Sequence, residues 1–299
     1  MPGRQPWTRR DLRSLGEALL YLGPSLVLFS AFVFVPLART LYLSFFYTNP
    51  IGNPTTFGGV EQYVALATSP EFLTGLRATF LFVLYSVPLG IAIALVLAVL
   101  GNQRLRGINL FRTLMSSTIA VSASVGALMW LLLFNPSLGL LNYLIGSIGL
   151  TGPNWLTDPN MAILSLSITT IWLMLGFNII VLLAGLQGIP EELYESARID
   201  GAMGVNTFRH ITIPLLSPSL FFLLVVDAIT VFQAFTQVRL LTQGGPVDTT
   251  RVLVYSIYLD AFVNFQFGYA SAQSMVLFFI ILLLTIIQFR FVERRVHYQ

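Results

Sequence analysis

The chain has 299 residues, of which 56% are hydrophobic and only 10% are charged. This balance argues against a water-soluble globular protein, because so few charged groups cannot cover its surface. All 16 basic residues are arginine and cysteine is absent, which excludes a lysine-dependent phosphate-binding loop, a Schiff-base lysine, thiolate metal sites and disulfides. The arginines are scattered in small groups instead of forming one basic face, so nucleic acid is not an expected partner.

Six long apolar windows dominate the chain. A bilayer core about 30 Å thick needs roughly 20 apolar residues in a helix that rises about 1.5 Å per residue. The first window is a span and not a secretory signal, since no small-x-small cleavage site closes it. Only the fifth window contains a charge, Asp227. The pattern predicts an all-α integral membrane protein with six transmembrane helices, at Ala18 to Leu37, Ala78 to Leu100, Thr113 to Phe134, Met161 to Leu186, Leu215 to Thr236 and Ala270 to Phe289.

Arginine placement predicts the orientation of these spans. Three groups lie before the first span, after the second and after the sixth: Arg4 to Arg13, Arg104 to Arg112 and Arg290 to Arg295. They share one face of the membrane only if an even number of spans separates them. Six spans with both termini cytoplasmic meet this condition and leave twelve arginines inside against four outside, as the positive-inside rule requires.

The segments between the spans divide the chain into three regions. Residues 1–72 form a cytoplasmic N-terminal tail, the first span and an external loop. Residues 73–292 form a five-span core, and residues 293–299 a cytoplasmic tail. The external segments are rich in Gly, Pro, Asn and aromatic residues, which predicts turns and short interfacial helices. They are Tyr47 to Gly75, Asn135 to Asn160 and Gln237 to Tyr269.

The segment at residues 189–214, between the fourth and fifth spans, is predicted to be a helix, a sharp turn and a second helix. Pro190 suits the first helical position and acidic residues follow it, while Gly201 can take the left-handed conformation that ends a helix. A helix is therefore expected from about Pro190 to Asp200. A second helix should begin near Ala202 and carry an apolar stripe until Pro214 opens the fifth span.

The residues of this segment resemble a family motif. Glu195-Ser196-Ala197, three residues, Gly201, nine residues and Ile211-Thr212-Ile213-Pro214 are similar to the E-A-A-x3-G-x9-I-x-L-P loop of permease subunits in binding-protein-dependent ABC importers. Ser196 replaces the middle alanine and Ile213 the leucine. The six-span pattern and the position of the loop agree with the sugar-type branch of that family.

The resemblance implies that residues 189–214 form a coupling loop, whose helix enters a groove of a separate ATPase subunit. Glu195 is then its polar anchor, Ala197 allows close packing, Asp200 and Gly201 make the turn, and Pro214 restarts the helix. The full set implied for coupling is Glu192, Glu195, Ser196, Ala197, Asp200, Gly201, Phe208 and Pro214. The alternative is a merely solvated amphipathic hairpin.

The resemblance also implies the composition of a whole importer in the bacterial cytoplasmic membrane. Its parts are this subunit, a second homologous permease, a dimer of ATP-binding subunits and an extracytoplasmic solute-binding protein. This chain then carries no cofactor and no catalytic residue, because Mg-ATP binds to the partner ATPase.

The end of the chain narrows the expected substrate. Residues Ala270 to Leu277 and Gln288 to Gln299 are similar to the closing segment of the first permease subunit of glycerol-3-phosphate importers. Gly244-Gly245-Pro246 and the aromatic run from Phe262 to Ala270 occur in other sugar permeases too. The expected cargo is therefore glycerol-3-phosphate or a glycerophosphodiester such as glycerophosphocholine, with a disaccharide or other sugar as the alternative.

A charged group inside a span is costly, so Asp227 is a candidate pathway residue that faces protein or water. The alternative is a carboxylate paired to a neighbouring subunit. In the pathway it could accept hydrogen bonds from hydroxyls, or attract a cationic head together with nearby aromatic rings. The remaining polar candidates are also plausible interhelical hydrogen-bond partners. The pathway candidates beside Asp227 are Trp172, Asn178, Phe232, Gln233, Phe235 and Gln237.

Two other classes compete with an importer subunit. A membrane hydrolase would need a serine with a histidine base, a carboxylate pair or an H-E-x-x-H site, but His210 and His297 have no such spacing. An ion-coupled secondary transporter could use Asp227. It would have no need to present the helix-turn-helix of residues 189–214 to the cytoplasm.

Overall fold

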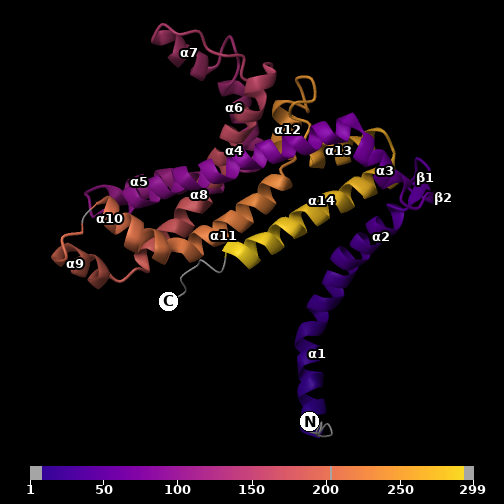
Figure 1. Cartoon of the computed structure of the whole chain (residues 1–299), viewed down its shortest axis with the longest axis horizontal. Helices are drawn as coiled ribbons and strands as arrows, with labels where there is room; N and C mark the ends of the chain where they lie inside the picture. The colour runs from indigo at the N-terminus through magenta and orange to yellow at the C-terminus, as the bar shows by residue number, and fades with distance from the viewer. Residues whose placement is uncertain (1–8, 203, 293–299) are drawn as a thin grey trace. The chain divides into compact units, whose positions relative to one another are not determined.

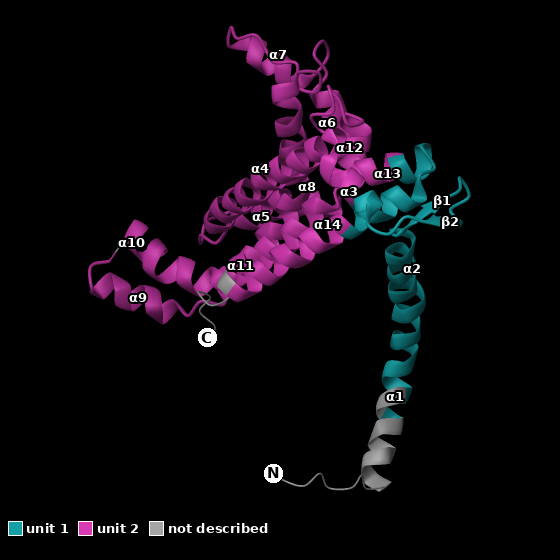
Figure 2. Cartoon of the chain, turned by 45° about the vertical axis from the view of Figure 1, so that its right-hand side comes forward, with its two compact units in different colours: residues 1–63, 260–275 teal, residues 64–259, 276–299 magenta. Residues whose placement is uncertain are grey.

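The computed structural model describes residues 9–202 and 204–292, and in this part the chain is almost entirely helical. Its contacts separate it into two compact units, coloured in Figure 2. Unit 1 comprises residues 1–63 and 260–275, and unit 2 comprises residues 64–259 and 276–299. Some residues used in the sequence predictions lie outside the described residues: Arg4, Arg294 and Arg295 of the cytoplasmic arginine groups, and His297.

The first span belongs to unit 1 and is one helical run with a π-helical segment inside it. It consists of α1 (Arg9–Phe29), the π-helix η1 (Ser30–Phe34) and α2 (Val35–Leu43). Pro36 has no N–H to donate to the carbonyl four residues earlier, which accounts for the change of helix type just before it. The apolar span covers Leu20–Leu43, and its most hydrophobic stretch is not buried within the described chain. The first span therefore ends at Leu43, beyond Leu37, where the predicted window ended.

A small antiparallel hairpin follows the first span, where the sequence predicted turns and short helices. It consists of β1 (Phe46–Thr48) and β2 (Pro54–Phe57), with Phe46 opposite Phe57. The buried Gln62 side chain donates to the Phe46 carbonyl at 2.8 Å. The Gly268 N–H donates to Thr48 Oγ1 at 3.0 Å. These bonds join the hairpin, α3 (Glu61–Thr68) and the beginning of α14 (Phe267–Ile287).

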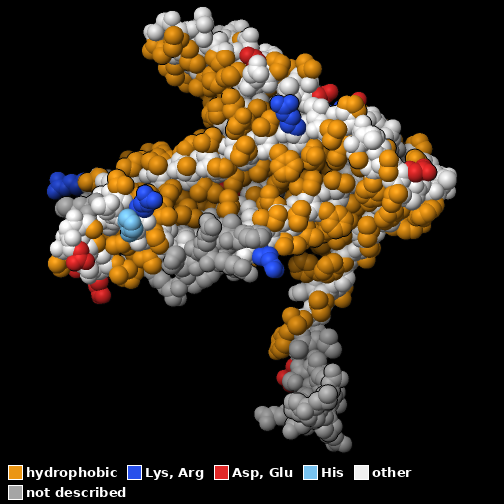
Figure 3. All heavy atoms as spheres, viewed as in Figure 1, with side chains coloured by type: hydrophobic (Ala, Val, Ile, Leu, Met, Phe, Trp, Pro, Cys, Tyr) orange, Lys and Arg blue, Asp and Glu red, His pale blue; other side chains and the backbone are white. Residues whose placement is uncertain are grey.

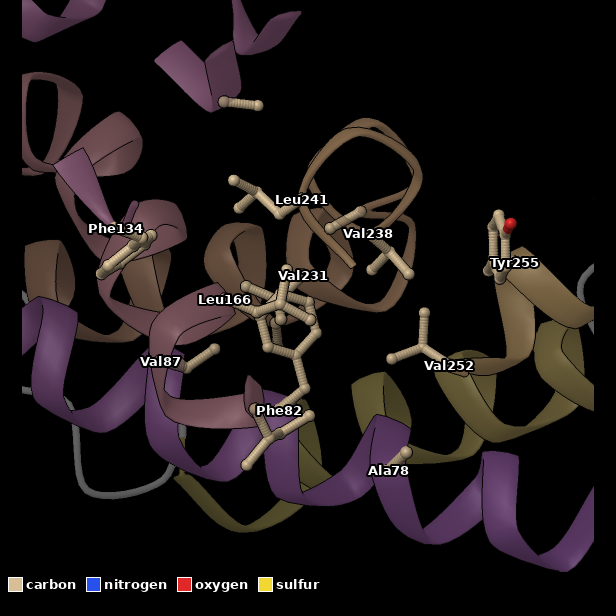
Figure 4. Close-up of a cluster of buried hydrophobic side chains, with 14 residues drawn as sticks. Ala78, Phe82, Val87, Phe134, Leu166, Val231, Val238, Leu241, Val252 and Tyr255 are labelled. Carbon is tan, nitrogen blue, oxygen red and sulfur yellow. The ribbon is translucent and has the colours of Figure 1, made fainter. Parts of the chain in front are cut away.

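Three long helices form the centre of unit 2 (Figure 1): α4 (Pro70–Gly101), α8 (Pro159–Gln187) and α11 (Ile213–Phe232). Small residues at every fourth position allow α4 and α8 to approach closely. Ala94 and Ala98 are fully buried, and a Cβ atom at Gly90 would lie 3.6 Å from Ile171. Around these helices lies a buried apolar cluster that includes Phe82, Leu166 and Val231 (Figure 4).

The third predicted span is broken. Helix α5 (Ile108–Ser116) continues as the 3-10 helix η2 (Ser117–Ala120), and α6 (Ala123–Leu133) leaves it at an angle of 105°. Val121 is extended, and the Ser122 hydroxyl caps α6 by accepting from Val125 N at 3.3 Å. An uninterrupted apolar composition does not reveal such a break, because serine is tolerated within spans but also caps new helices.

By length and composition, five described helices could each cross a membrane, and the number rises to six if the bent pair forms one span. Hydrophobic side chains cover most of the visible surface (Figure 3), as expected for a protein whose outer faces meet lipid or other subunits. The remaining elements are α7 (Leu140–Ser147), α9 (Glu191–Ile199), α10 (Val205–Thr207), the π-helix η3 (Phe208–Thr212), α12 (Thr236–Leu241), α13 (Leu253–Tyr258), and the π-helices η4 (Leu259–Val263) and η5 (Gln288–Val292).

Candidate functional site

The first helix of residues 189–214, the predicted coupling loop, forms as the sequence predicted. Helix α9 begins after Pro190 and ends at Ile199, within one residue of the expected bounds. Gly201 has φ +77° and takes the left-handed conformation. The N–H of Ala202 donates to the Ala197 carbonyl at 2.8 Å, and the N–H of Gly201 donates to the Arg198 carbonyl at 3.1 Å. Together these two bonds make a Schellman turn, which satisfies the last carbonyls of the helix.

The second helix of the loop begins later than predicted and does not stop at Pro214. Gly204 has φ +58°, and α10 starts at Val205 instead of Ala202. The chain then continues through η3 into α11, so residues 205–232 form one helical run. Pro214 lies in the first turn of α11 but does not restart the helix. Its missing N–H leaves the His210 carbonyl without the usual donor, and the π-helix of residues 208–212 accommodates this loss.

Side-chain contacts hold α9 beside its neighbours. The hydroxyls of Tyr194 and Thr212 lie 3.2 Å apart and connect α9 to η3. Arg104, in the loop after α4, forms an ion pair with Glu191 at 2.7 Å. Both of these side chains are largely exposed, at 85% and 63%, so the pair is worth at most about 1 kcal/mol. The ion pair therefore contributes little to the stability of α9 in this position.

A cavity of about 980 Å³ lies between α9 and the ends of α4 and α8. Charged and polar side chains line it, among them Arg104, Arg112, Arg198 and Glu195, and Phe208 contributes an aromatic ring. Arg112 is held in place because its Nε donates to the Gly101 carbonyl at 2.7 Å. The recess is therefore open and polar, and it belongs entirely to unit 2.

Five of the eight residues predicted for coupling lie on α9 or at its C-terminal cap, and they fall into two groups. Ala197 is buried, which agrees with the close packing expected of it. The acidic and hydroxyl side chains of α9 are exposed and lie on one short helix, where another protein could contact them: Glu192, Glu195, Ser196 and Asp200.

Sequence reasoning missed the contribution of Arg104 and the cavity itself. The available signal was charge complementarity, since Arg104 and Glu191 begin two loops that were both predicted to be cytoplasmic.

Two of the predicted pathway residues are joined within the chain. Asp227 on α11 and Asn178 on α8 are each 1% exposed. Asn178 Nδ2 donates to Asp227 Oδ2 at 2.7 Å. The alternative prediction for Asp227, a pairing with a neighbouring subunit, is not needed to provide it with a hydrogen-bond donor. Whether Asp227 contacts substrate stays a prediction.

The structure does not bring the other pathway candidates into one group. Trp172 packs edge-on against Trp130, with ring centroids 6.2 Å apart. Phe232 is buried against Phe80, and the Phe235 ring lies 4.9 Å from that of Tyr258. Gln237 is buried, whereas Gln233 is exposed at the end of α11.

The match to a known family covers the loop of residues 189–214 and every span after the first. Residues 80–298 match the family described as binding-protein-dependent transport system inner membrane component. The chain belongs to this family. It is a multi-pass membrane permease of an inner-membrane ABC transport system. The role of residues 189–214 in coupling stays a prediction.

Curated relatives of the permease cover almost its full length. The protein named "sn-glycerol-3-phosphate transport system permease protein UgpA" from Brucella abortus biovar 1 is 38% identical over 93% of this chain and 94% of its own. The protein of the same name from Agrobacterium fabrum is 37% identical, over 93% and 95%. That from Yersinia enterocolitica serotype O:8 is 36% identical, over 92% and 94%.

Solved structures support the fold of the permease. A chain from a bacterial ABC transporter involved in the import of the acidic polysaccharide alginate has a TM-score of 0.83 at 24% identity, covering 95% of this chain and 98% of that one. A second structure, of a bacterial alginate ABC transporter in complex with an alginate pentasaccharide-bound periplasmic protein, gives a TM-score of 0.84 at 23% identity, covering 95% and 96%.

Proposed function

We propose that this permease moves sn-glycerol-3-phosphate, or a glycerophosphodiester such as glycerophosphocholine, across the bacterial plasma membrane as part of an ATP-driven importer. The observation that carries the proposal is the identity of 36–38% over more than nine-tenths of the chain to permeases named for sn-glycerol-3-phosphate transport. The resemblance of the C-terminal segment to the same importers agrees with it.

In this proposal the chain is a non-catalytic subunit with six spans, both termini in the cytoplasm and no cofactor of its own. Mg-ATP binds to a dimer of partner ATPases, and helix α9 enters a groove of one of them. The exposed acidic side chains and the sharp Schellman turn at Gly201 support this role, because they present a short, well-defined helix beyond the ends of α4 and α8.

The substrate pathway is proposed to lie where this permease meets a second, homologous one. Among the predicted pathway residues, Gln233 is exposed and Trp172 and Phe235 are half-buried, so their side chains are the most accessible to a substrate. No arginine lies deep in a predicted span, so a phosphate group would be recognised by backbone amides, by outer arginines or by the partner permease.

The first test is purification of the tagged permease from its native membranes in mild detergent, with mass spectrometry of the copurifying proteins. The proposal predicts an ATPase, a second permease and a solute-binding protein. Recovery of the chain alone as a stable self-oligomer would favour an ion-coupled carrier instead.

The second test is uptake by proteoliposomes that contain the purified complex. Glycerol-3-phosphate or glycerophosphocholine should accumulate when the binding protein is outside and ATP inside, and not with an ATPase that cannot hydrolyse ATP. A proton gradient without ATP is the matched control. If the complex takes up a disaccharide but neither glycerol compound, the proposed substrate class is wrong. Uptake driven by the proton gradient without ATP would overturn the importer assignment.

A further inference from the structure

Two buried carboxyl groups of the chain have contrasting surroundings. Asp260 is 7% exposed and both of its oxygens accept hydrogen bonds, Oδ1 from Asn264 Nδ2 and Oδ2 from Gln273 Nε2, each at 2.8 Å. Asp227 is more deeply buried, and only its Oδ2 has a donor, Asn178 Nδ2. Two donors suit an anionic carboxylate, whereas a buried anion with a single neutral donor is left largely uncompensated.

Each side chain of the Asp227–Asn178 pair has one oxygen without a donor, and in the described part of the chain Asp227 is the one carboxyl group with such a buried oxygen. Asp227 Oδ1 and Asn178 Oδ1 are both buried without a hydrogen-bond partner. An ionised carboxylate is an acceptor only, and the amide oxygen is an acceptor too, so neither can satisfy the other. A protonated carboxyl group has an O–H donor, which an ionised carboxylate lacks and which the Asn178 amide oxygen can accept from.

We propose that Asp227 is protonated on Oδ1 in the folded permease and donates this proton to Asn178 Oδ1, closing a two-bond acid–amide pair between α11 and α8. In this pair the Asn178 amide donates to Asp227 Oδ2 and the Asp227 hydroxyl donates to Asn178 Oδ1. Each polar group of the two side chains that faces the other then has a partner, and the pair carries no charge.

The neighbouring helices do not offer a counter-ion that would favour the anion. Helices α4 and α8 pack against α11. Helix α8 contains no titratable residue, and the titratable residues of α4 are Glu71, Arg77 and Tyr85. Arg77 is the only cation of these two helices, and η5, whose Gln288 amide donates to the Leu224 carbonyl of α11, adds Arg290. No ion pair joins either arginine to Asp227 in the described part of the chain. An anionic Asp227 would therefore be buried without a compensating charge.

A neutral pair has two consequences. It places one polar contact between α8 and α11 without the cost of a bare charge in the bilayer. It also removes the repulsion that an anionic Asp227 would exert on a phosphate in transit. The second consequence rests on the proposed substrate, whereas the pair itself does not depend on it.

Infrared difference spectroscopy of the purified permease in lipid nanodiscs tests the pair directly. The wild-type spectrum minus that of Asp227→Asn at neutral pH should contain the carbonyl stretch of a protonated carboxylic acid, shifted in D₂O. Asparagine at 227 can form the same two bonds with Asn178, so this variant should fold. The matched control is Asp260→Asn, whose difference spectrum should contain carboxylate bands only.

Two further measurements keep the result decisive. Asn178→Leu should retain the protonated-acid band but move it to higher frequency, because the acid loses its hydrogen-bond partner. Wild-type protein labelled with 13C-aspartate should show the band even if Asp227→Asn cannot be purified, since labelling restricts the signal to the six aspartates. Carboxylate bands alone at 227, or a band that disappears when Na⁺ is added, would refute the pair and indicate an anion or a cation site.

Discussion

At the scale of single residues, Gly201 determines the shape of the loop at residues 189–214. Its φ of +77° favours glycine, and no neighbouring atom lies within 4 Å of where a Cβ would be. We expect Gly201→Asp to reach the membrane at wild-type levels, since a left-handed residue with a side chain costs about 1–2 kcal/mol, which is small beside the packing of the spans. Uptake should nevertheless be lost, because in the proposed importer the altered turn and added charge would face the ATPase. Quantitative immunoblotting and uptake assays measure both effects.

Gly107 offers a matched control for that substitution. It also has a positive φ, +82°, and open space around its Cβ position, but it precedes α5 instead of following α9. Gly107→Asp therefore introduces the same side chain and similar backbone strain outside residues 189–214. It should retain most of the uptake. Equal loss in the two variants would mean that backbone strain, and not coupling, explains the defect.

Asn178 and Asp227 allow a prediction about stability. Replacing Asn178 by Leu leaves a buried carboxyl group without its partner, so we expect the permease to lose about 1–2 kcal/mol of stability. Asp227→Leu should cost a similar amount, whereas Asp227→Asn should cost much less. The double change to leucine should cost less than the sum of the two single changes. Thermal unfolding in detergent measures this, and strict additivity would show that the two side chains do not interact.

The residues of the loop were more predictable from sequence than those of the spans. Gly201 follows a local rule of helix capping, which depends on a few neighbours in sequence, and the family motif placed Ala197. Pro190 was predicted at the first helical position and lies one residue earlier, at the N-cap. The partnership of Asp227 with Asn178 depends on how α8 and α11 face each other. The two helices have nearly uniform apolar composition, so periodicity does not show which side of each one is buried.

At the scale of elements, the break in the third predicted span is held by α8. The Gly176 N–H donates to Thr118 Oγ1 at 2.8 Å. A Cβ at Gly176 would lie 2.6 Å from the Ser116 carbonyl oxygen and 2.7 Å from the Ile119 nitrogen. We expect Gly176→Ala to displace the bent pair and destabilise the permease by about 1–3 kcal/mol. Its melting temperature in detergent should fall measurably.

Gly146→Ala is the control for that change. Gly146 lies within α7 and no atom lies within 4 Å of its Cβ position. Alanine is favoured over glycine in a helix by up to about 1 kcal/mol, so this variant should be as stable as the wild type or slightly more so. If Gly176→Ala is also as stable as the wild type, then α8 does not approach the break as closely as described.

The sequence predicted the long helices themselves better than their ends, since α4 begins at Pro70 instead of Ala78 and α11 ends at Phe232 instead of Thr236. Helix α8 departs from its predicted window by two residues at one end and one at the other. The hairpin of β1 and β2 escaped prediction because strands of three and four residues are too short to show alternation. The π-helices before Pro36 and Pro214 also escaped prediction. A proline inside a helix predicts a change of geometry but not its type.

At the scale of the whole molecule, the number of spans decides which loops share a side of the membrane. If the bent pair of α5 and α6 crosses the bilayer as one span, three spans separate β2 from α9, and the two elements face opposite sides. If it does not cross, two spans separate them and they face the same side. The absence of cysteine makes this question accessible by single-cysteine labelling.

Thr56 in β2 and Ser196 in α9 are both exposed and suit this measurement. We expect a membrane-impermeant maleimide to label Thr56→Cys only in right-side-out vesicles and Ser196→Cys only in inside-out vesicles. A permeant maleimide, which should label both variants in either preparation, is the control for thiol reactivity. Labelling of both from the same side would show that the bent pair returns to the face from which it entered. Six spans with both termini inside would then be impossible, and the arginine groups before and after the bent pair would need a different explanation.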